Sequence, residues 1–201
     1  MHNNTESRMK EFIRNKIKTS IDLKTSLLTN EAILASIENI VNDSVQAYKN
    51  DGKVLWCGNG GSAADAQHLA AELSGRFYYD RPPLFSEALH VNTSYTTAVA
   101  NDYSYDEIYS RLVKAMGRKG DVLIGLSTSG NSGNVVKAIE TANSLGMITV
   151  GFTGESGGKM KNICKYLVNI PSTDTPRIQE CHMLLGHTIC ELVESTLYPK
   201  K

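Results

Sequence analysis

The sequence predicts an α/β fold, a three-layer αβα sandwich around a five-stranded parallel sheet, preceded by N-terminal helices. Five short apolar runs alternate with segments in which apolar residues recur every three or four positions. Each run is almost continuously apolar, which is typical of parallel strands covered by helices on both faces. Because the chain shows no linker, repeat or low-complexity stretch, we expect residues 1–201 to form a single domain.

The elements of this domain are expected in a regular order. A helical arm occupies about residues 1–50 with a break near 28–30, a sheet core follows over about 51–175, and a last helix spans about 176–197. Two helices ahead of the first strand are typical of a packing arm that supports oligomerisation. The strands are expected at residues 54–57, 84–91, 121–126, 147–152 and 166–170, and the helices between them at 63–74, 93–116 (interrupted near 101–102), 135–145 and near 158.

The overall charge and the cysteines exclude some classes of protein. Lys and Arg together number 21, as do Asp and Glu, so the formal net charge is zero and the basic excess of a nucleic-acid binder is lacking. No run has the length of a membrane span, and no apolar signal core is present. We therefore expect a cytoplasmic protein without nucleic-acid or membrane partners. The cysteines lie in apolar patterns without C-x-x-C spacing, which indicates buried free thiols in a reducing compartment; they are Cys57, Cys164, Cys181 and Cys190.

A turn rich in hydroxyl groups follows the third strand. A buried strand, a Ser/Thr/Gly turn and a helix start succeed one another there, and free backbone N–H groups with the helix dipole make such a corner an anion site. Because no Lys or Arg lies within the turn, it is better suited to binding a phosphate monoester than to catalysing phosphoryl transfer. The alternative is a hydroxyl-rich N-cap without a ligand. The turn reads Ser127, Thr128, Ser129, Gly130, Asn131 and Ser132.

A glycine-rich turn follows the first strand. Residues 58–63 match the G-x-G-x-x-[GA] pattern of dinucleotide sites, which alone is weak evidence. The acid at about the right spacing, Asp80, lies in a segment with two prolines that is a poor strand end, and the G-K-[ST] of a P-loop is missing. With the serine turn nearby, a sugar phosphate fits better than a nucleotide, so we expect no nucleotide cofactor.

Two helices carry side chains that suit acid–base chemistry. On the helix after the glycine-rich turn, His68 and Glu72 are four residues apart and share a face, where a partly desolvated carboxylate can serve as a general base. The alternative is an exposed His–Glu pair. On the last helix, Gln179 and His187 are separated by about 12 Å along the axis, so they meet one ligand only if both lean inward. The alternative is that they are ordinary surface residues. Gly186 indicates a close approach of another element.

Together these residues resemble the sugar isomerase (SIS) domain family, and specifically the phosphoheptose isomerases. The resemblance covers nearly the whole chain and implies a flavodoxin-like strand order. The family converts sedoheptulose 7-phosphate to D-glycero-D-manno-heptose 7-phosphate, the entry to heptose for surface polysaccharides. The resemblance rests on residues 57–62, His68 with Glu72, Asn101-Asp102, residues 127–132, and residues 177–180 with His187.

The resemblance implies a role for each matching residue. Glu72 would remove the proton from the carbon beside the carbonyl, and His187 would act as the acid at oxygen, so that the reaction passes through an enediol. The phosphate would be held by Ser127, Thr128, Ser129 and Ser132. The sugar would contact Asn59, Gly60, Gly61, Ser62, Glu72, Asn101, Asp102 and Gln179.

The resemblance also implies a metal and an oligomer. Some members carry one Zn²⁺ per subunit, in a catalytic, structural or inhibitory role. The family is a homotetramer with active sites between subunits, which would bring the last helix to the first turn and give the N-terminal helices their packing role. The positions of the zinc ligands are occupied here by His68, Glu72, Gln179 and His187.

One residue departs from the family pattern, and two other functions are alternatives to a phosphoheptose isomerase. Thr175-Pro176 precedes Arg177 where some members have an acidic residue, and Asp174 is the nearest replacement. The main alternative function is a non-catalytic SIS protein that binds a sugar phosphate or a replication-initiator partner as a regulator. The presence of both Glu72 and His187 argues against it, because a pure binder needs no acid–base pair. Within the enzyme class, the alternative is another aldose–ketose phosphate isomerase.

Overall fold

The computed structural model describes residues 2–200 and contains a five-stranded parallel sheet. Its strand order is β2-β1-β3-β4-β5, and each neighbouring pair is parallel. The predicted fold class and strand order are thereby confirmed. The order changes direction between β1 and β3, which is where ligands bind in sheets of this kind. The strands are β1 (Val54–Gly58), β2 (Ser86–Ala88), β3 (Val122–Leu126), β4 (Ile148–Thr153) and β5 (Tyr166–Asn169).

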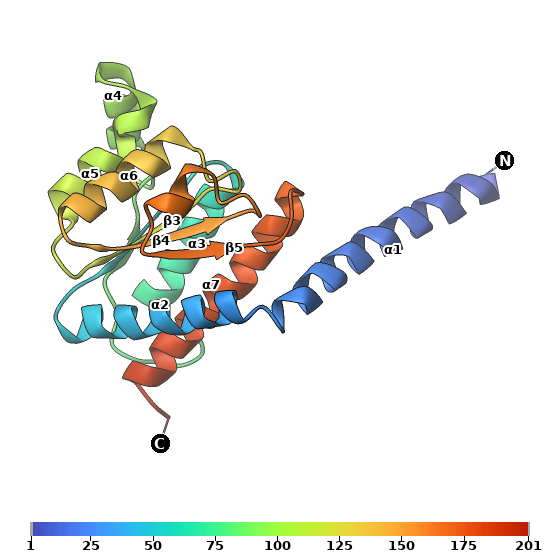
Figure 1. Cartoon of the computed structure of the whole chain (residues 1–201), viewed down its shortest axis with the longest axis horizontal. Coiled ribbons are helices and arrows are strands. Elements are labelled where there is room, and N and C mark those ends of the chain that lie inside the picture. The colour runs from blue at the N-terminus through green and yellow to red at the C-terminus, as the bar shows by residue number, and fades with distance from the viewer. Residues whose placement is uncertain (1, 201) are drawn as a thin grey trace.

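Helices cover both faces of the sheet and complete the three layers (Figure 1). α2, α3 and α7 pack on one face, and α5 and α6 with part of α4 pack on the other. The helices are α1 (His2–Leu27), α2 (Glu31–Lys49), α3 (Gly61–Ser74), α4 (Thr93–Asp102), α5 (Ile108–Met116), α6 (Gly133–Ser144) and α7 (Thr175–Leu197), with short 3₁₀ helices η1 (Tyr105–Glu107) and η2 (Gly158–Asn162).

Side chains of the central strands alternate between two hydrophobic cores. Trp56, Ile124 and Phe152 are fully buried among α2, α3 and α7. Leu55 and Leu123 point the other way and are fully buried with α5 and α6. Because neither face of the sheet meets water, both sets of alternate residues must be apolar, which explains the continuous apolar runs in the sequence.

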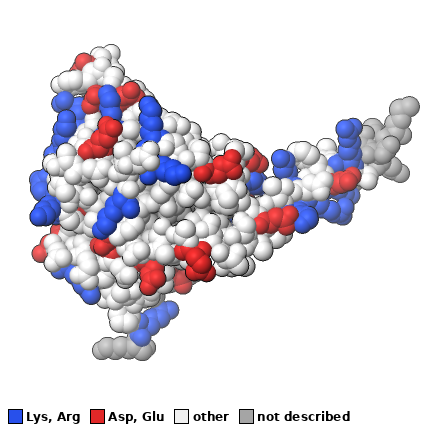
Figure 2. All heavy atoms as spheres, in the orientation of Figure 1, with Lys and Arg blue, Asp and Glu red and all other residues white. Residues whose placement is uncertain are grey.

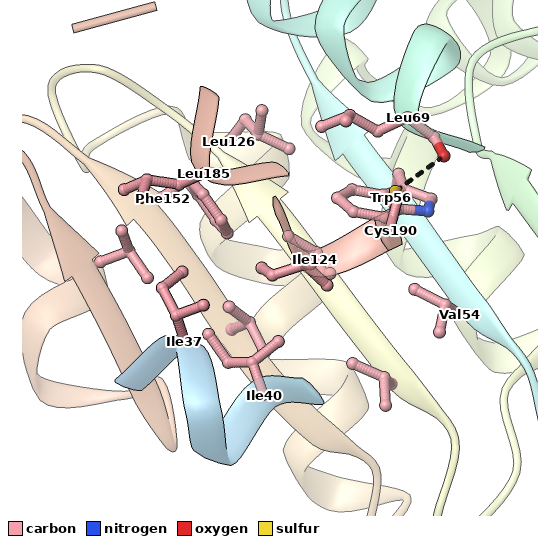
Figure 3. Packing of buried hydrophobic residues seen from close by; sticks show 14 of the residues in the cluster. Ile37, Ile40, Val54, Trp56, Leu69, Ile124, Leu126, Phe152, Leu185 and Cys190 are labelled. Atoms are coloured by element: carbon pink, nitrogen blue, oxygen red, sulfur yellow. Dashed lines mark hydrogen bonds between the residues drawn. The ribbon is translucent and has the colours of Figure 1, made fainter. Parts of the chain in front are cut away.

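α3 and α7 approach each other closely where Gly186 faces Leu69. A Cβ placed on Gly186 would lie 2.4 Å from Cδ1 of Leu69. One turn later the thiol of Cys190 donates to the Leu69 carbonyl at 3.7 Å, close to the buried Trp56 (Figure 3). The close approach predicted at Gly186 is therefore made with α3 of the same chain.

Only the first of the two N-terminal helices is an arm. α1 extends away from the body, whereas α2 lies along it (Figure 1). The arm predicted over about residues 1–50 is therefore too long, because the apolar stripe of α2 covers the sheet and buries Ile33, Ile37 and Ile40. α1 instead leaves large apolar side chains between 51% and 62% exposed: Met9, Phe12, Ile13, Ile17 and Ile21.

The second strand is shorter than the predicted residues 84–91. β2 is an edge strand that pairs with β1 from Ser86 to Ala88. The chain then turns toward α4, whose N-cap, Asn92, accepts a hydrogen bond from the Tyr95 N–H at 3.0 Å. Leu89 is buried in this turn, so its apolar character reflects packing rather than strand pairing.

The distribution of charged side chains on the surface agrees with the formal net charge of zero, and the cysteines are free thiols as predicted. Figure 2 shows acidic and basic side chains interspersed over the visible face of the body. Across residues 2–200, no helix has both the length and the apolar character needed to cross a membrane. The cysteines are free thiols: Cys57, Cys181 and Cys190 are buried, and Cys164 is half-buried.

Candidate active site

The glycine-rich turn and the serine turn lie side by side at one edge of the sheet. β1 and β3 are neighbours, with Gly58 in register with Leu126, so both strands end at the same level. Asn59 of the first turn and Asn134 at the start of α6 exchange amide hydrogen bonds, in which each Nδ2 donates to the other residue's Oδ1, at 2.8 and 2.9 Å. This reciprocal pair joins the two turns into one surface.

The serine turn is held in shape by its own hydroxyls. Ser127 is buried, and its Oγ lies 2.9 Å from Oγ of Ser132 and 3.4 Å from Oγ of Ser129. Gly130 has a φ of +67°, and a Cβ there would lie 2.1 Å from the Gly157 carbonyl oxygen, so a side chain has no room. Three of the four hydroxyls predicted to bind phosphate therefore converge.

A cleft of about 280 Å³ opens beside the serine turn. Its many hydroxyl groups suit a phosphate or a polyol. Asp174, the candidate replacement for the expected acidic residue, is the N-cap of α7 and lies between two residues that line this cleft. The lining residues are Thr128, Ser129, Asn131, Glu155, Ser156, Ser172, Thr173, Thr175 and Ile178.

The start of α3 receives a side chain from α7. Gly60 has a φ of +55°, and the following Ser62 is buried. A Cβ on Gly61 would lie 2.6 Å from Nε2 of Gln179, so the Gln179 amide lies against the first turn. Gln179 therefore lies next to the turn that was predicted to bind the sugar. It is about 10 Å along α3 from His68, so Gln179 lies apart from the other three predicted metal ligands.

His68, Glu72 and His187 form a cluster where α3 meets α7. Nε2 of His68 lies 2.9 Å from Oε1 of Glu72 and 3.2 Å from Nε2 of His187. One donor atom from each residue lies within 4.8 Å of the other two. A ring nitrogen carries either one proton or one lone pair, so Nε2 of His68 cannot both donate to Glu72 and accept from His187. Convergent donor atoms of this kind fit a divalent cation, and two imidazoles with a carboxylate are a donor set for Zn²⁺.

Burial sets the charge state around this cluster. Partial burial and the neighbouring His68 hold the pKa of His187 below its usual range, against the opposing effect of Glu72. His187 is therefore a neutral imidazole at pH 7, with one ring N–H to donate. Burial also raises the pKa of Asp65, one turn before His68, although His68 opposes the rise. Within residues 2–200, Oδ2 of Asp65 is buried without a hydrogen-bond partner.

The cluster exists because α3 and α7 run side by side in the same direction. Gln179 meets Gly61 near the two helix starts, and His187 meets His68 farther along, with almost the same offset in residue number. The close contact between Gly186 and Leu69 lies directly beside the His187–His68 contact. The last helix thus reaches the first turn within one chain, so no subunit contact is needed for it.

The structure places Asn101 and Asp102, which were predicted to contact the sugar, on its surface. They end α4, the helix that projects from the body in Figure 1. Nδ2 of Asn101 donates to Oδ1 of Asp102 at 2.9 Å, and both residues are exposed. One chain therefore presents them on a projecting part of its surface.

The residues that sequence reasoning missed support the first turn. The Tyr105 hydroxyl donates to Oδ1 of Asn59 at 3.1 Å, and the Tyr109 hydroxyl donates to the Gly58 carbonyl. Asn134, which completes the amide pair with Asn59, is only 2% exposed. The available signal was a polar residue directly before the apolar stripe of the helix that follows the serine turn.

Comparison with known proteins decides the family. A model of the SIS domain matches residues 19–154. The phosphoheptose isomerase of Aneurinibacillus thermoaerophilus is 48% identical over 193 residues, which cover 96% of this chain and 98% of the relative. That of Clostridium acetobutylicum is 50% identical with the same coverage. The chain belongs to the SIS domain family, among the phosphoheptose isomerases.

A solved structure extends this membership to the fold. The phosphoheptose isomerase of Neisseria gonorrhoeae matches with a TM-score of 0.86 and 41% sequence identity, covering 93% of this chain and 99% of that one. The order of the elements also bears on the dinucleotide pattern of the glycine-rich turn. Asp80 precedes β2, whereas the ribose-binding acid of a dinucleotide site follows the second strand, so Asp80 cannot take that role.

Proposed function

We propose that this chain is an aldose–ketose isomerase that converts sedoheptulose 7-phosphate to D-glycero-D-manno-heptose 7-phosphate. The observation that carries the proposal is the meeting of the Glu72 carboxylate and the His187 imidazole around His68. Relatives that are 48% and 50% identical over 96% of the chain are named phosphoheptose isomerases, which supports the same reaction here.

The acid–base pair accounts for the reaction. Glu72 removes a proton from carbon 1 of the ketose, and His187 donates a proton to the carbonyl oxygen on carbon 2, which gives an enediol. A proton then returns to carbon 2 while the hydroxyl on carbon 1 loses its proton, and the aldose results.

The two turns position the substrate. The serine turn holds the phosphate through the hydroxyls of Ser127, Thr128, Ser129 and Ser132, and the adjoining cleft receives it. The sugar lies toward the first turn, where Gln179 faces Gly61. Its other contacts are Asn59, Gly60, Ser62, Asn101 and Asp102.

The cluster is also the place for the metal. His68, Glu72 and His187 would hold one Zn²⁺ in a ligand set that overlaps the acid–base pair, and such an ion would supply Lewis-acid stabilisation of a developing oxyanion. Gln179 reaches this group only by leaving Gly61, so we assign it to the sugar first.

Exposed apolar surfaces support a homotetramer with active sites between subunits. The stripe along α1 is large, and an apolar groove of about 350 Å³ runs between α2 and α7. Such surfaces mark protein–protein contacts. Glu72 lies about 16 Å along α3 from Gly61, and the end of α4 projects from the body. One chain therefore holds the acid–base pair and the predicted sugar contacts apart, and a second copy would bring them to the same sugar. Light scattering on the purified protein tests this: four copies are expected, and a monomer would contradict it.

The cellular setting follows from the thiols and the product. Free, mostly buried cysteines support a reducing, cytoplasmic compartment. The product would enter the heptose supply for surface polysaccharides.

One assay tests the activity. Purified protein is incubated with sedoheptulose 7-phosphate, with and without a chelator, and proton NMR follows the anomeric signals of the aldoheptose. Formation of the aldoheptose is expected. Binding of the ketose without conversion, in either condition, would favour the alternative of a non-catalytic SIS regulator.

A further inference from the structure

Arg81 and Glu194 form a buried ion pair that is separate from the cluster of His68, Glu72 and His187. Nε of Arg81 donates to Oε1 of Glu194 at 3.1 Å, and both side chains are 1% exposed. Glu194 also accepts from the backbone N–H groups of Phe77 and Tyr78, each at 2.8 Å. Burial alone would raise the pKa of Glu194, but these N–H groups and Arg81 outweigh it and hold the pKa below its usual range. Glu194 is therefore a carboxylate, and it binds the loop after α3.

Arg81 of this pair also binds the end of α3 that carries Glu72. The guanidinium of Arg81 donates to the backbone carbonyl of Glu72 at 2.9 Å and to that of Gly75 at 3.0 Å. These are carbonyls of the last helical turn, which lack partners within the helix. Arg81 thus fixes the backbone from which the Glu72 side chain projects.

The pair also connects this end of α3 to the helix that carries His187. Glu194 lies two turns beyond His187 on α7. Phe77, whose N–H it binds, places its ring 5.7 Å from the His187 ring. Any slip of α3 along α7 would have to break the contacts of Arg81 and Glu194.

We propose that Arg81 and Glu194 are positioning residues that set the register of α3 against α7 and so hold Glu72, His68 and His187 in their reactive arrangement. This inference rests on the proposed function. A buried ion pair is weak evidence for stability, since apolar residues of similar volume often serve equally well. Apolar residues could not bind the backbone carbonyls and N–H groups that Arg81 and Glu194 hold in place.

Two variants separate positioning from stability. Glu194→Gln removes the charge with little change in shape. The double variant Arg81→Met with Glu194→Leu fills the same space with apolar side chains and keeps the chain folded if the single variant does not. The matched control is Lys53→Met, which breaks the Lys53–Asp121 pair just before β1 and β3, with side chains 12% and 2% exposed.

Metal affinity can be measured separately from stability, and a purely structural role of the ion pair would leave it unchanged. The metal-free full chain is titrated with Co²⁺ alone, followed by visible absorption, and kcat and KM are measured on the same preparations. We expect Co²⁺ affinity about 10- to 100-fold weaker in both test variants. We also expect kcat to fall by at least about tenfold with KM changed by less than about threefold. Lys53→Met should change neither quantity.

Each contrary outcome identifies what has failed. Folded test variants with wild-type Co²⁺ affinity and kcat would overturn the positioning role, as would equal losses in Lys53→Met. A wild-type protein that forms no aldoheptose would overturn the proposed function instead. In that case the Co²⁺ titration still decides whether Arg81 and Glu194 hold the cluster together.

Discussion

The Nε2 atoms of His68 and His187 lie 3.2 Å apart although the two residues are 119 positions apart in the chain. They meet because α3 and α7 are parallel neighbours and because Gly186 lets the helices come close. Glu72 joins them through a 2.9 Å contact with His68. The chemistry that we propose depends on this meeting, and the predictions below test its parts.

Glu72→Gln is expected to abolish isomerisation and to leave sugar-phosphate binding within about tenfold, roughly 1.4 kcal/mol. The amide keeps the shape of the side chain and cannot accept the proton from carbon 1. Turnover by proton NMR and binding by calorimetry with sedoheptulose 7-phosphate are the measurements. Turnover close to wild type would show that another group is the base.

Ser129→Ala is expected to raise KM more than it lowers kcat. Ser129 lines the cleft beside the serine turn, and its hydroxyl would contact the phosphate in the ground state and the transition state alike. Ser144→Ala, at the far end of α6, is the matched control and should change neither constant. A fall in kcat at unchanged KM would remove Ser129 from the phosphate site.

Gly186→Ala is expected to destabilise the fold by about 1–3 kcal/mol, even though alanine favours a helix over glycine by about 1 kcal/mol. The added methyl would lie 2.4 Å from Cδ1 of Leu69 and force the two helices apart. Urea unfolding measures the loss. Combining Gly186→Ala with Leu69→Ala should relieve the clash, so the two effects should be less than additive. A single variant as stable as wild type would contradict the close packing.

Stability is expected to fall as pH drops from about 6.5 to about 4 because of His182. Burial lowers the pKa of His182 to about 4, although its ring contact with the Thr153 carbonyl at 3.1 Å opposes the shift. The unfolded histidine titrates near 6.5, so between these values the unfolded state binds the extra proton and gains about 3 kcal/mol relative to the native state. Below pH 4 both states are protonated and the effect levels off.

Urea unfolding between pH 4 and pH 8 measures this effect. His182→Gln can keep a donor for the Thr153 carbonyl but does not titrate, so its stability should depend less on pH in the same window. If the variant and the wild type showed the same dependence, another group would be responsible.

The sequence predicted the parts of the fold that depend on local pattern. The apolar runs of the central strands and the stripes of α3, α6 and α7 gave the sheet, its layers and most element boundaries. The length of β2 could not be predicted, because Leu89 is apolar for packing in a turn and not for pairing. The packing of α2 on the sheet could not be predicted either, since an amphipathic helix has the same pattern whether it covers its own sheet or another subunit.

The site was only partly accessible from the sequence for the same reason. His68 with Glu72 could be paired by helical spacing, and the two turns could be placed at one edge of a parallel sheet. The approach of His187 could not be derived from spacing, because it depends on the direction of α7 relative to α3. Asn134 and Tyr105 escaped notice because their partner, Asn59, lies on a distant segment.

The place of α7 at the end of the chain has a consequence for biosynthesis. The ribosome completes the sheet and the serine turn before it makes the helix that carries His187. A nascent chain at that stage has the serine turn but lacks His187 of the proposed acid–base pair and the Glu194 partner of Arg81. A product that stops short of α7 would lack both His187 and Glu194, together with the apolar side chains that α7 buries against the sheet, and we expect it to be inactive.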